Sequence, residues 1–305
     1  MNIKALMITL LLIYLLLISS TQNATASSGD NKQKINTQQK ETIMTYRKYD
    51  STKTRVIPVF DRISKTDKSW LRRLLKLPKH GSLSVNSTKG DDLTVENKYW
   101  GDKEKTIDPP VSLLNWLISN PPDSLSKLDH SVTNSTNWKR YHLWLKDPAV
   151  LDEAKHQLQL NHKVTAWYVL EGKTHPDVLI YTPSTIIVIE GKRTEVGPTK
   201  STTWMSNRHQ MLRHIDAAWE IRGNRKVFGF FIVEGESGGE IPIKWEKAAR
   251  NTVSQATVNG SLPHRTIDER RDISNCFIGV TTWQAVCSEF KLDCNKVFKP
   301  DQPYT

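Results

Sequence analysis

Two short apolar runs, residues 178–181 and 185–190, are separated only by the letters TPS. Runs of this length, rich in β-branched side chains, predict strands, and so short a connection predicts that the strands pair antiparallel. A two-residue turn at 183–184 sets the register and places Asp177 directly opposite Glu190. The side chains of directly opposite residues lie on one face of a sheet, about 4.5–5.5 Å apart at Cβ.

This hairpin also predicts a charged cluster at its open end. Lys192 lies two residues beyond Glu190, so it projects from the same face of the strand. Two carboxylates at such a distance repel each other, and a divalent cation would offset the repulsion strongly. Mg²⁺ is typically held by one or two carboxylates together with waters and phosphate oxygens. A lysine beside the cation could orient a water molecule and contact a phosphate, so the cluster predicts metal-assisted phosphodiester hydrolysis.

The spacing of these residues resembles a known nuclease motif. A Pro-Asp dipeptide ending at Asp177, twelve intervening residues and then the tripeptide EGK from Glu190 to Lys192 resemble the PD-(D/E)xK motif of the restriction-endonuclease-like superfamily. The resemblance covers residues 147–235 and implies an α/β fold, with a central mixed β-sheet flanked by helices. It implies that Asp177 and Glu190 bind Mg²⁺, with Mn²⁺ as the alternative ion, and that Lys192 positions or activates the attacking water.

The same resemblance implies roles for residues outside the motif. Many members carry a further acid on the preceding helix, and Glu153 matches that position, with Glu171 as a competing candidate. Several members place a catalytic glutamine on the helix after the motif, and Gln210 fits that place. Glu153 would then be a third metal ligand and Gln210 a fourth catalytic residue.

The pattern of apolar residues and turn signals predicts a mixed α/β core. Helical periodicity alternates with short apolar runs, which is typical of helices packed on a central sheet. The expected order is helix 147–161, strands 164–170, 177–182 and 185–192, helix 204–221, strand 226–235, and a further strand and helix within 274–292.

The charge balance indicates a polyanionic partner. The net charge is +11 and the pI is about 9.4, which favours nucleic acid or an anionic membrane surface. Arginines cluster in and after the motif, and we expect Arg193, Arg208 and Arg213 to contact the phosphate backbone. DNA is the expected substrate and RNA an alternative.

A homodimer is one way in which both strands could be cut. A nucleic-acid-binding protein of the same fold without cleavage activity is the alternative function.

The N-terminal region is considered apart from the core. Residues 1–43 comprise an apolar run that resembles an export signal and a polar linker, followed by Met44 and a basic sequence. An exported or membrane-anchored binding protein is therefore a third interpretation, and a cytoplasmic protein is expected if translation starts at Met44. The remaining chain divides into an irregular, helical N-terminal lobe at 44–137 and the nuclease-like core at 138–305.

Cysteine and histidine spacings give no metal signature of their own. The three cysteines, Cys276, Cys287 and Cys294, match no zinc pattern and are expected to be packed free thiols. Gln210, Arg213 and His214 are expected on one face of their helix, near the active site. His209 and His214 are expected at the surface or in contact with DNA rather than as metal ligands.

Overall fold

A computed structural model describes residues 51–82, 90–161 and 165–299 of the chain. The predictions made for the export-like segment and the polar linker at 1–43, and for Met44, lie outside these residues. Within the described part of the chain, no helix has the length and apolar character that a membrane crossing requires.

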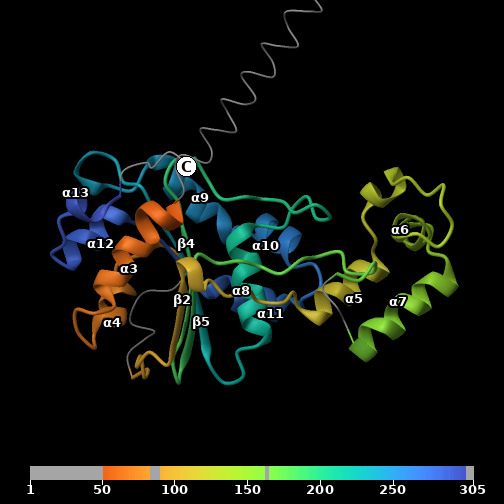
Figure 1. Cartoon of the computed structure of the whole chain (residues 1–305), viewed down its shortest axis with the longest axis horizontal. Helices are drawn as coiled ribbons and strands as arrows, with labels where there is room; N and C mark the ends of the chain where they lie inside the picture. The colour runs from red at the N-terminus through yellow and green to blue at the C-terminus, as the bar shows by residue number, and fades with distance from the viewer. Residues whose placement is uncertain (1–50, 83–89, 162–164, 300–305) are drawn as a thin grey trace, which may run out of the picture. The chain divides into compact units, whose positions relative to one another are not determined.

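A six-stranded open sheet forms the centre of the structure, with the strand order β1-β6-β5-β4-β3-β2 (Figure 1). The chain is thus α/β with a mixed sheet. The strands β4, β5 and β6 run parallel, and the pairs β1–β6, β2–β3 and β3–β4 are antiparallel. The strands are β1 (Lys79–His80), β2 (Asn97–Trp100), β3 (Val178–Tyr181), β4 (Thr185–Gly191), β5 (Lys226–Val233) and β6 (Phe277–Thr282).

The predicted hairpin is present in the predicted register. Val178 pairs with Ile189, and the backbone N–H of Thr182 donates to the carbonyl of Thr185 at 2.9 Å, which closes a two-residue turn. Continuing this register by one residue brings Asp177 opposite Glu190. The arrangement that the sequence predicted for the two acids is therefore confirmed.

Helices cover both faces of the sheet (Figure 1). One face packs against α3, α4 and α12, and the other against α8 to α11. Along β4, Ile187 and Ile189 enter the first core, whereas Ile186 and Val188 enter the second. The helices of these layers are η1 (Thr52–Val56), α3 (Ile57–Ile63), α4 (Trp70–Leu74), α8 (Gln210–Glu220), η5 (Ser237–Gly239), α9 (Ile243–Thr252), α10 (Gln255–Ser261), α11 (Ile267–Asn275), α12 (Trp283–Glu289) and α13 (Cys294–Val297).

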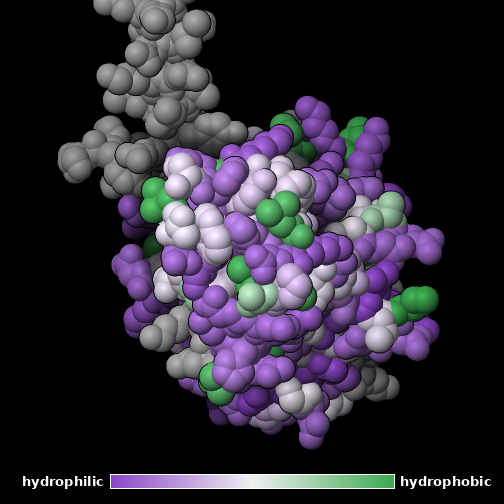
Figure 2. Space-filling model, turned by 90° about the vertical axis from the view of Figure 1, so that its right-hand side faces the viewer, coloured by the Kyte–Doolittle hydropathy of each residue, from purple (hydrophilic) through white to green (hydrophobic). Residues whose placement is uncertain are grey.

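A third apolar cluster holds a helical subdomain beside the sheet. Its helices are α5 (Val111–Ser119), η4 (Asp123–Lys127), α6 (Thr136–Trp144) and α7 (Pro148–Asn161). The short η3 (Gly101–Lys103) precedes them and lies beside Ile57 of α3. The helix predicted at 147–161 is therefore confirmed. Figure 2, which turns one side of the molecule to the viewer, shows a mostly hydrophilic surface with hydrophobic residues interspersed.

The strand predicted at 164–170 is wrong. The described residues of this stretch form turns, and a backbone hydrogen bond from Val169 to Ala166 closes one of them. Tyr168 and Leu170 are buried in the helical subdomain against Met205. These apolar side chains pack in a helical core rather than in the sheet. A short apolar run is compatible with either environment, so the sequence pattern alone does not separate them.

The other predicted elements differ from the structure mainly at their ends. The helix predicted at 204–221 begins later, at Gln210, because residues 201–209 form a loop. Residues of this loop form turn hydrogen bonds instead of helical ones. For example, the backbone N–H of Thr202 donates to the carbonyl of Met205. β1 and β2, from the region expected to form an irregular lobe, lie at the two edges of the sheet.

We predict that Gly279→Ala destabilises the fold by about 3 kcal/mol, because it combines backbone strain with overpacking. Gly279 has φ +114°, and a Cβ there would lie 1.9 Å from the carbonyl oxygen of Lys79 on β1. Urea denaturation followed by tryptophan fluorescence measures the change. Gly197→Ala is the control, because a Cβ at Gly197 would meet no atom within 4 Å. Equal stability of the two variants would contradict the prediction.

Candidate functional site

The two predicted acids meet at one edge of the sheet. Asp177 immediately precedes β3, and Glu190 is the penultimate residue of β4. One carboxylate oxygen of Asp177, Oδ2, accepts the backbone N–H of Gly191 at 2.7 Å, and the other, Oδ1, lies 3.2 Å from the hydroxyl of Thr52. The hairpin register and the π-helical segment η1 together fix the orientation of Asp177.

Glu190 is the best-connected side chain of the site. It is buried, with 4% of its surface exposed, and Lys192 Nζ donates to its Oε1 at 2.8 Å. Gln210 Nε2 donates to the same oxygen at 2.6 Å, and His214 Nε2 lies 3.1 Å from Oε2. The structure therefore brings together four of the predicted residues, since Gln210 joins Asp177, Glu190 and Lys192.

His214 belongs to this site, as its predicted place on the helix face near the active site implied. The expectation that it lies at the surface is wrong. Only 3% of it is exposed, because α8 presents it to the sheet one turn after Gln210. A carboxylate only accepts hydrogen bonds, so Nε2 carries the proton toward Glu190. Nδ1 then faces the hydroxyl of Thr174 at 2.6 Å. The spacing of Gln210 and His214, one helical turn apart, was the available sequence signal.

The two acids hold their protons with different strength. Removal from water raises the pKa of Asp177 well above its usual value, and the charge of Glu190 raises it further. Burial also acts to raise the pKa of Glu190, but the hydrogen bond and charge of His214 and the charge of Lys192 outweigh it, so this pKa is lowered. In the metal-free protein Glu190 is the carboxylate and Asp177 the acid that retains a proton more readily.

Lys192 is a cation at neutral pH. Burial lowers its pKa, but the charge and hydrogen bond of Glu190 raise it more, and the net pKa is above the usual value. A lysine that keeps its proton acts as a charge and a hydrogen-bond donor rather than as a base. Of the two roles that the resemblance implies for Lys192, this protonation state suits the positioning of water and phosphate.

The acid pair has the donor capacity that a magnesium ion requires. A carboxylate offers about four lone-pair directions, and the contacts given above leave directions on both oxygens of Asp177 and on Oε2 of Glu190. One or two carboxylates plus waters and phosphate oxygens are the usual set for Mg²⁺. Among the described residues no group of three or more histidine, cysteine or acidic side chains could hold a metal ion. The acid pair therefore fits a cation shared with the substrate better than a closed protein cage.

Neither predicted third acid reaches the pair. Glu153 lies on α7 in the helical subdomain, where it bonds Lys139 at 2.5 Å and Gln157 at 3.0 Å. Glu171 is buried and forms an ion pair with Arg213 at 2.8 Å. Besides Glu190, the charge of Glu104 makes a small contribution to the raised pKa of Asp177. Glu104 follows η3, far from the motif in sequence, so no local pattern indicated it.

The arginines predicted to contact nucleic acid have different surroundings. Arg208 is unavailable for this role, because its side chain is fully buried and bonds Asp216 at 2.8 Å. Arg213 is a quarter exposed and bonds the carbonyls of Gly172 and Lys173 beside its ion pair. Arg193 is partly exposed in the loop that follows β4. Arg193 and Arg213 thus stay candidates.

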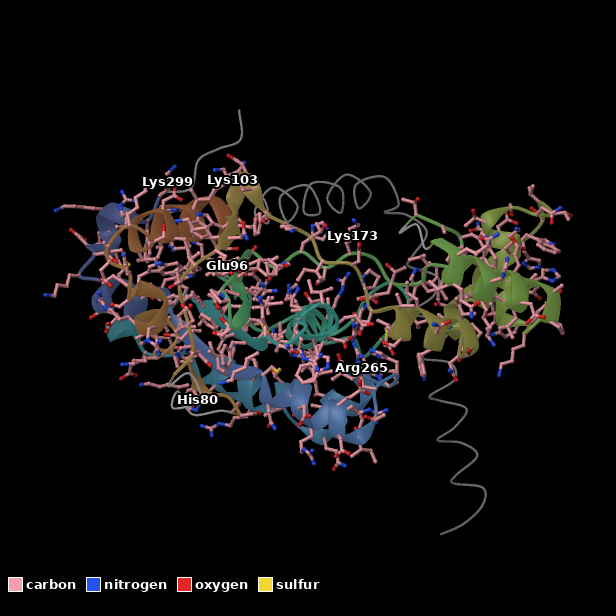
Figure 3. The ribbon with its side chains drawn as sticks, turned by 90° about the horizontal axis from the view of Figure 1, so that it is seen from below. His80, Glu96, Lys103, Lys173, Arg265 and Lys299 are labelled. Carbon is pink, nitrogen blue, oxygen red and sulfur yellow. The ribbon has the colours of Figure 1, made fainter. Side chains whose placement is uncertain are left out.

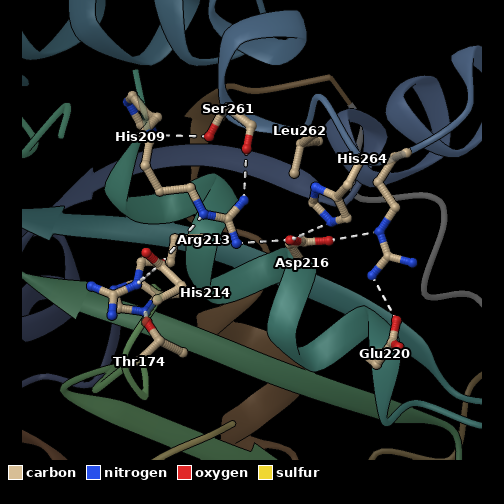
Figure 4. Close-up of polar contacts among 12 residues, drawn as sticks. Thr174, His209, Arg213, His214, Asp216, Glu220, Ser261, Leu262 and His264 are labelled. Carbon is tan, nitrogen blue, oxygen red and sulfur yellow. Dashed lines mark hydrogen bonds and ion pairs between the residues drawn. The ribbon is translucent and has the colours of Figure 1, made fainter. Parts of the chain in front are cut away.

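A buried ionic cluster centred on Asp216 anchors the helix that carries Gln210 and His214 (Figure 4). Asp216 is fully buried and bonds Arg208 at 2.8 Å and Arg265 at 2.9 Å, with His264 at 3.2 Å. Burial acts to raise the pKa of Asp216, but the charges of Arg208 and Arg265 and the hydrogen bond of His264 hold it well below its usual value. Arg265 lies in the connection between α10 and α11 (Figure 3), so the cluster joins α8 to that connection.

The cysteines are free thiols, as predicted. Cys276 and Cys287 are buried and Cys294 is partly exposed. Burial raises the pKa of Cys276 to about 12, so this thiol is a packing residue rather than a nucleophile.

Comparisons of the chain with protein-family models, curated proteins and solved structures found no match.

We predict that Asp216→Asn costs about 3 kcal/mol of stability, because it removes the buried charge that Arg208 and Arg265 share. Arg208 then keeps only Glu171, at 3.5 Å, and Arg265 keeps the partly exposed Glu220 and Glu269. Urea denaturation at pH 7 measures the loss. Asp268→Asn is the matched control, since Asp268 is 79% exposed on α11, and we expect it to stay within about 0.5 kcal/mol of the wild type. A loss below about 1 kcal/mol for Asp216→Asn would show that the cluster does not anchor α8.

The raised pKa of Asp177 predicts a pH-dependent stability in the absence of metal. A group whose folded pKa exceeds its unfolded pKa, about 3.9 for aspartate, stabilises the fold below the unfolded value. That stability is lost as the pH rises through the folded pKa, by about 1.4 kcal/mol for each pH unit of the window. In EDTA, the stability of Asp177→Asn relative to the wild type should therefore increase as the pH rises above about 4. Parallel stability curves for the two proteins would refute the prediction.

Proposed function

We propose that this chain is a metal-dependent endonuclease that hydrolyses phosphodiester bonds in DNA, on a restriction-endonuclease-like core. The observation that carries the proposal is the group at the open end of the β3–β4 hairpin. Two acids face each other across the hairpin, and a lysine ammonium lies 2.8 Å from one of them. The mixed sheet and the glutamine contact from the following helix agree with the same motif.

The protonation states suit the chemistry of phosphate-ester hydrolysis. A divalent cation, when bound, would polarise a phosphoryl oxygen and lower the pKa of a nearby water. Glu190 is held as a carboxylate by Lys192, Gln210 and His214, so it is ready to bind a cation. Asp177 would have to give up its proton to hold the cation, so cation binding would depend on pH.

Lys192 and Gln210 act on the substrate side of the acid pair. The ammonium of Lys192 can donate to the scissile phosphate or to the attacking water while Glu190 holds its position. The amide of Gln210, on α8, donates a hydrogen bond to the same oxygen of Glu190 and holds that carboxylate in position. Both residues thus hold the reacting groups in place, and this positioning lowers the barrier without a change in their own protonation.

The surrounding charge supports a polyanionic substrate. The chain carries a net charge of +11, and Arg193 and Arg213 are exposed in part near the ends of β4 and α8. Basic side chains around a metal site provide the phosphate-backbone contacts that nucleic-acid binding requires. Two adjacent acids facing a phosphate would weaken a protein that only binds nucleic acid, so the acid pair favours the enzyme over the non-cleaving alternative.

We predict that the purified full chain cuts plasmid DNA with Mg²⁺ or Mn²⁺ and not with EDTA. Asp177→Asn and Lys192→Met should each lower the cleavage rate at least about a hundredfold, because each removes a group that acts on the reacting phosphate. Plasmid nicking and linearisation measure the rate, and single-stranded DNA and RNA serve as further substrates.

Matched controls separate the site from general charge effects. Asp268→Asn and Lys296→Ala remove the same charges from side chains that are 79% and 85% exposed, and both should cut at the wild-type rate. Cleavage that survives Asp177→Asn and Lys192→Met would place the active site elsewhere. Binding of DNA without cleavage, in the presence of either cation, would favour the non-cleaving binding protein.

A further inference from the structure

Thr174 places a buried hydroxyl against the ring of His214 (Figure 4). The residue is 1% exposed, and its Oγ1 lies 2.6 Å from His214 Nδ1. A threonine hydroxyl can both donate and accept a hydrogen bond, so it satisfies Nδ1 while Nε2 donates to Glu190 at 3.1 Å. Because an imidazole ring is rigid, contacts at both nitrogens fix its orientation. Thr174 therefore acts on Glu190 through the ring.

The two oxygens of Glu190 differ in their surroundings. In the ranges that the structure describes, Oε1 accepts from Lys192 and Gln210, whereas Oε2 accepts from His214 alone. Oε2 is thus the oxygen with a lone-pair direction left for a cation, and one contact decides where that direction points. If the ring of His214 turned, Oε2 would be free to move, and a shared cation would lose one of its two fixed carboxylates.

The backbone of Thr174 is fixed where two connecting segments meet. The chain enters the helical subdomain after Ile107 and leaves it before Thr174, and these two residues form an antiparallel bridge. Their N–H and C=O groups bond each other at 3.0 and 2.9 Å, and Lys173 forms an ion pair with Asp108 at 3.1 Å beside the bridge. Arg213, on α8, donates to the carbonyl of Lys173 at 2.8 Å. The hydroxyl of Thr174 is therefore held at a defined place relative to α8.

We propose that Thr174 is a positioning residue of the cation site. Its hydroxyl orients the ring of His214, and the ring holds Glu190 Oε2 where it shares a cation with Asp177. The cation rests on the proposed function, whereas the contacts from Thr174 through His214 to Glu190 do not. Loss of a group that orients a metal-binding side chain usually weakens metal binding about 10- to 100-fold.

The test is calorimetric titration of the full chain with Mn²⁺ at pH 7, in the absence of nucleic acid. Thr174→Val keeps the shape of the side chain and removes the hydroxyl, so it should weaken Mn²⁺ binding at least about tenfold. Thr174→Ala removes the hydroxyl without placing a methyl group against Nδ1, and it should weaken binding in the same direction. Thr174→Ser keeps the hydroxyl and should bind Mn²⁺ as the wild type does.

Thr252→Val is the matched control for the loss of a buried hydroxyl. Thr252 is fully buried, and its hydroxyl also lies against a histidine ring, 3.3 Å from Nε2 of His209. His209 is itself buried, so the expectation that it lies at the surface is wrong. Within the described chain neither group contacts Glu190. We expect Thr252→Val to lose stability in urea, as Thr174→Val does, but to bind Mn²⁺ as the wild type does.

Two further measurements separate positioning from a general loss of stability. In His214→Leu, which removes both ring nitrogens, the addition of Thr174→Val should leave the affinity for Mn²⁺ unchanged, because the hydroxyl then has no ring to orient. In cleavage of plasmid DNA, Thr174→Val should raise the half-saturating Mg²⁺ concentration by the same factor as it weakens Mn²⁺ binding. The cleavage rate at saturating Mg²⁺ should change less.

Three results would overturn the proposal. These are Mn²⁺ binding that is unchanged in Thr174→Val, binding that is weakened equally in Thr252→Val, and a further loss when Thr174→Val is added to His214→Leu. The first result, together with metal-dependent cleavage by the wild type, would remove the role of Thr174 alone. Mn²⁺ binding that depends on Thr174, without any cleavage, would keep that role and remove the nuclease proposal. No Mn²⁺ binding by the wild type at millimolar concentration would remove both.

Discussion

Two carboxyl groups that face each other across a hairpin and are partly shielded from water repel each other, and the site is organised around this repulsion. The protein offsets the free-energy cost of this repulsion more strongly at Glu190 than at Asp177. Glu190 receives donors from the side chains of Lys192, Gln210 and His214, whereas Asp177 receives only neutral donors, the backbone N–H of Gly191 and the hydroxyl of Thr52. The result is one stable carboxylate beside one acid with a raised pKa, a division that burial and neighbouring charge produce together. A pair arranged in this way is prepared for a cation that replaces the proton.

Helix α8 carries two of these donors, so its position decides whether the site forms. The helix packs its apolar side on the sheet through Met211 and Ile215, while Gln210 and His214 reach Glu190. The ionic cluster of Asp216 holds the same helix from its other side. Buried ion pairs contribute little net stability on average, but they define one geometry when every partner is present. We infer that this cluster is retained because it fixes the position of α8.

Much of the site could be predicted from local sequence. The hairpin register follows from two apolar runs and a short turn, and this register alone places Asp177, Glu190 and Lys192 together. Gln210 was predicted from the resemblance to the PD-(D/E)xK motif, which implies a glutamine on the helix after the motif. Glu104 could not be found in this way, because it comes from a loop 73 residues before Asp177 and acts only through the folded chain. The burial of Arg208 was equally hidden, since its partner Asp216 and the carbonyl of Ser261 become neighbours only when α8 and α10 pack.

The sequence by itself determined the α/β class, the hairpin and the identity of the central acids, because these depend on alternation and on contacts between residues close in the chain. Tertiary structure decided which of the remaining charged residues take part in the site. Glu153 and Arg208 carry suitable chemistry but pack elsewhere, whereas His214 and Thr174 form a hydrogen-bonded support for Glu190. The physical reason is that a long-range contact depends on how helices pack over a sheet, and the short pattern around a charged residue carries no record of that packing.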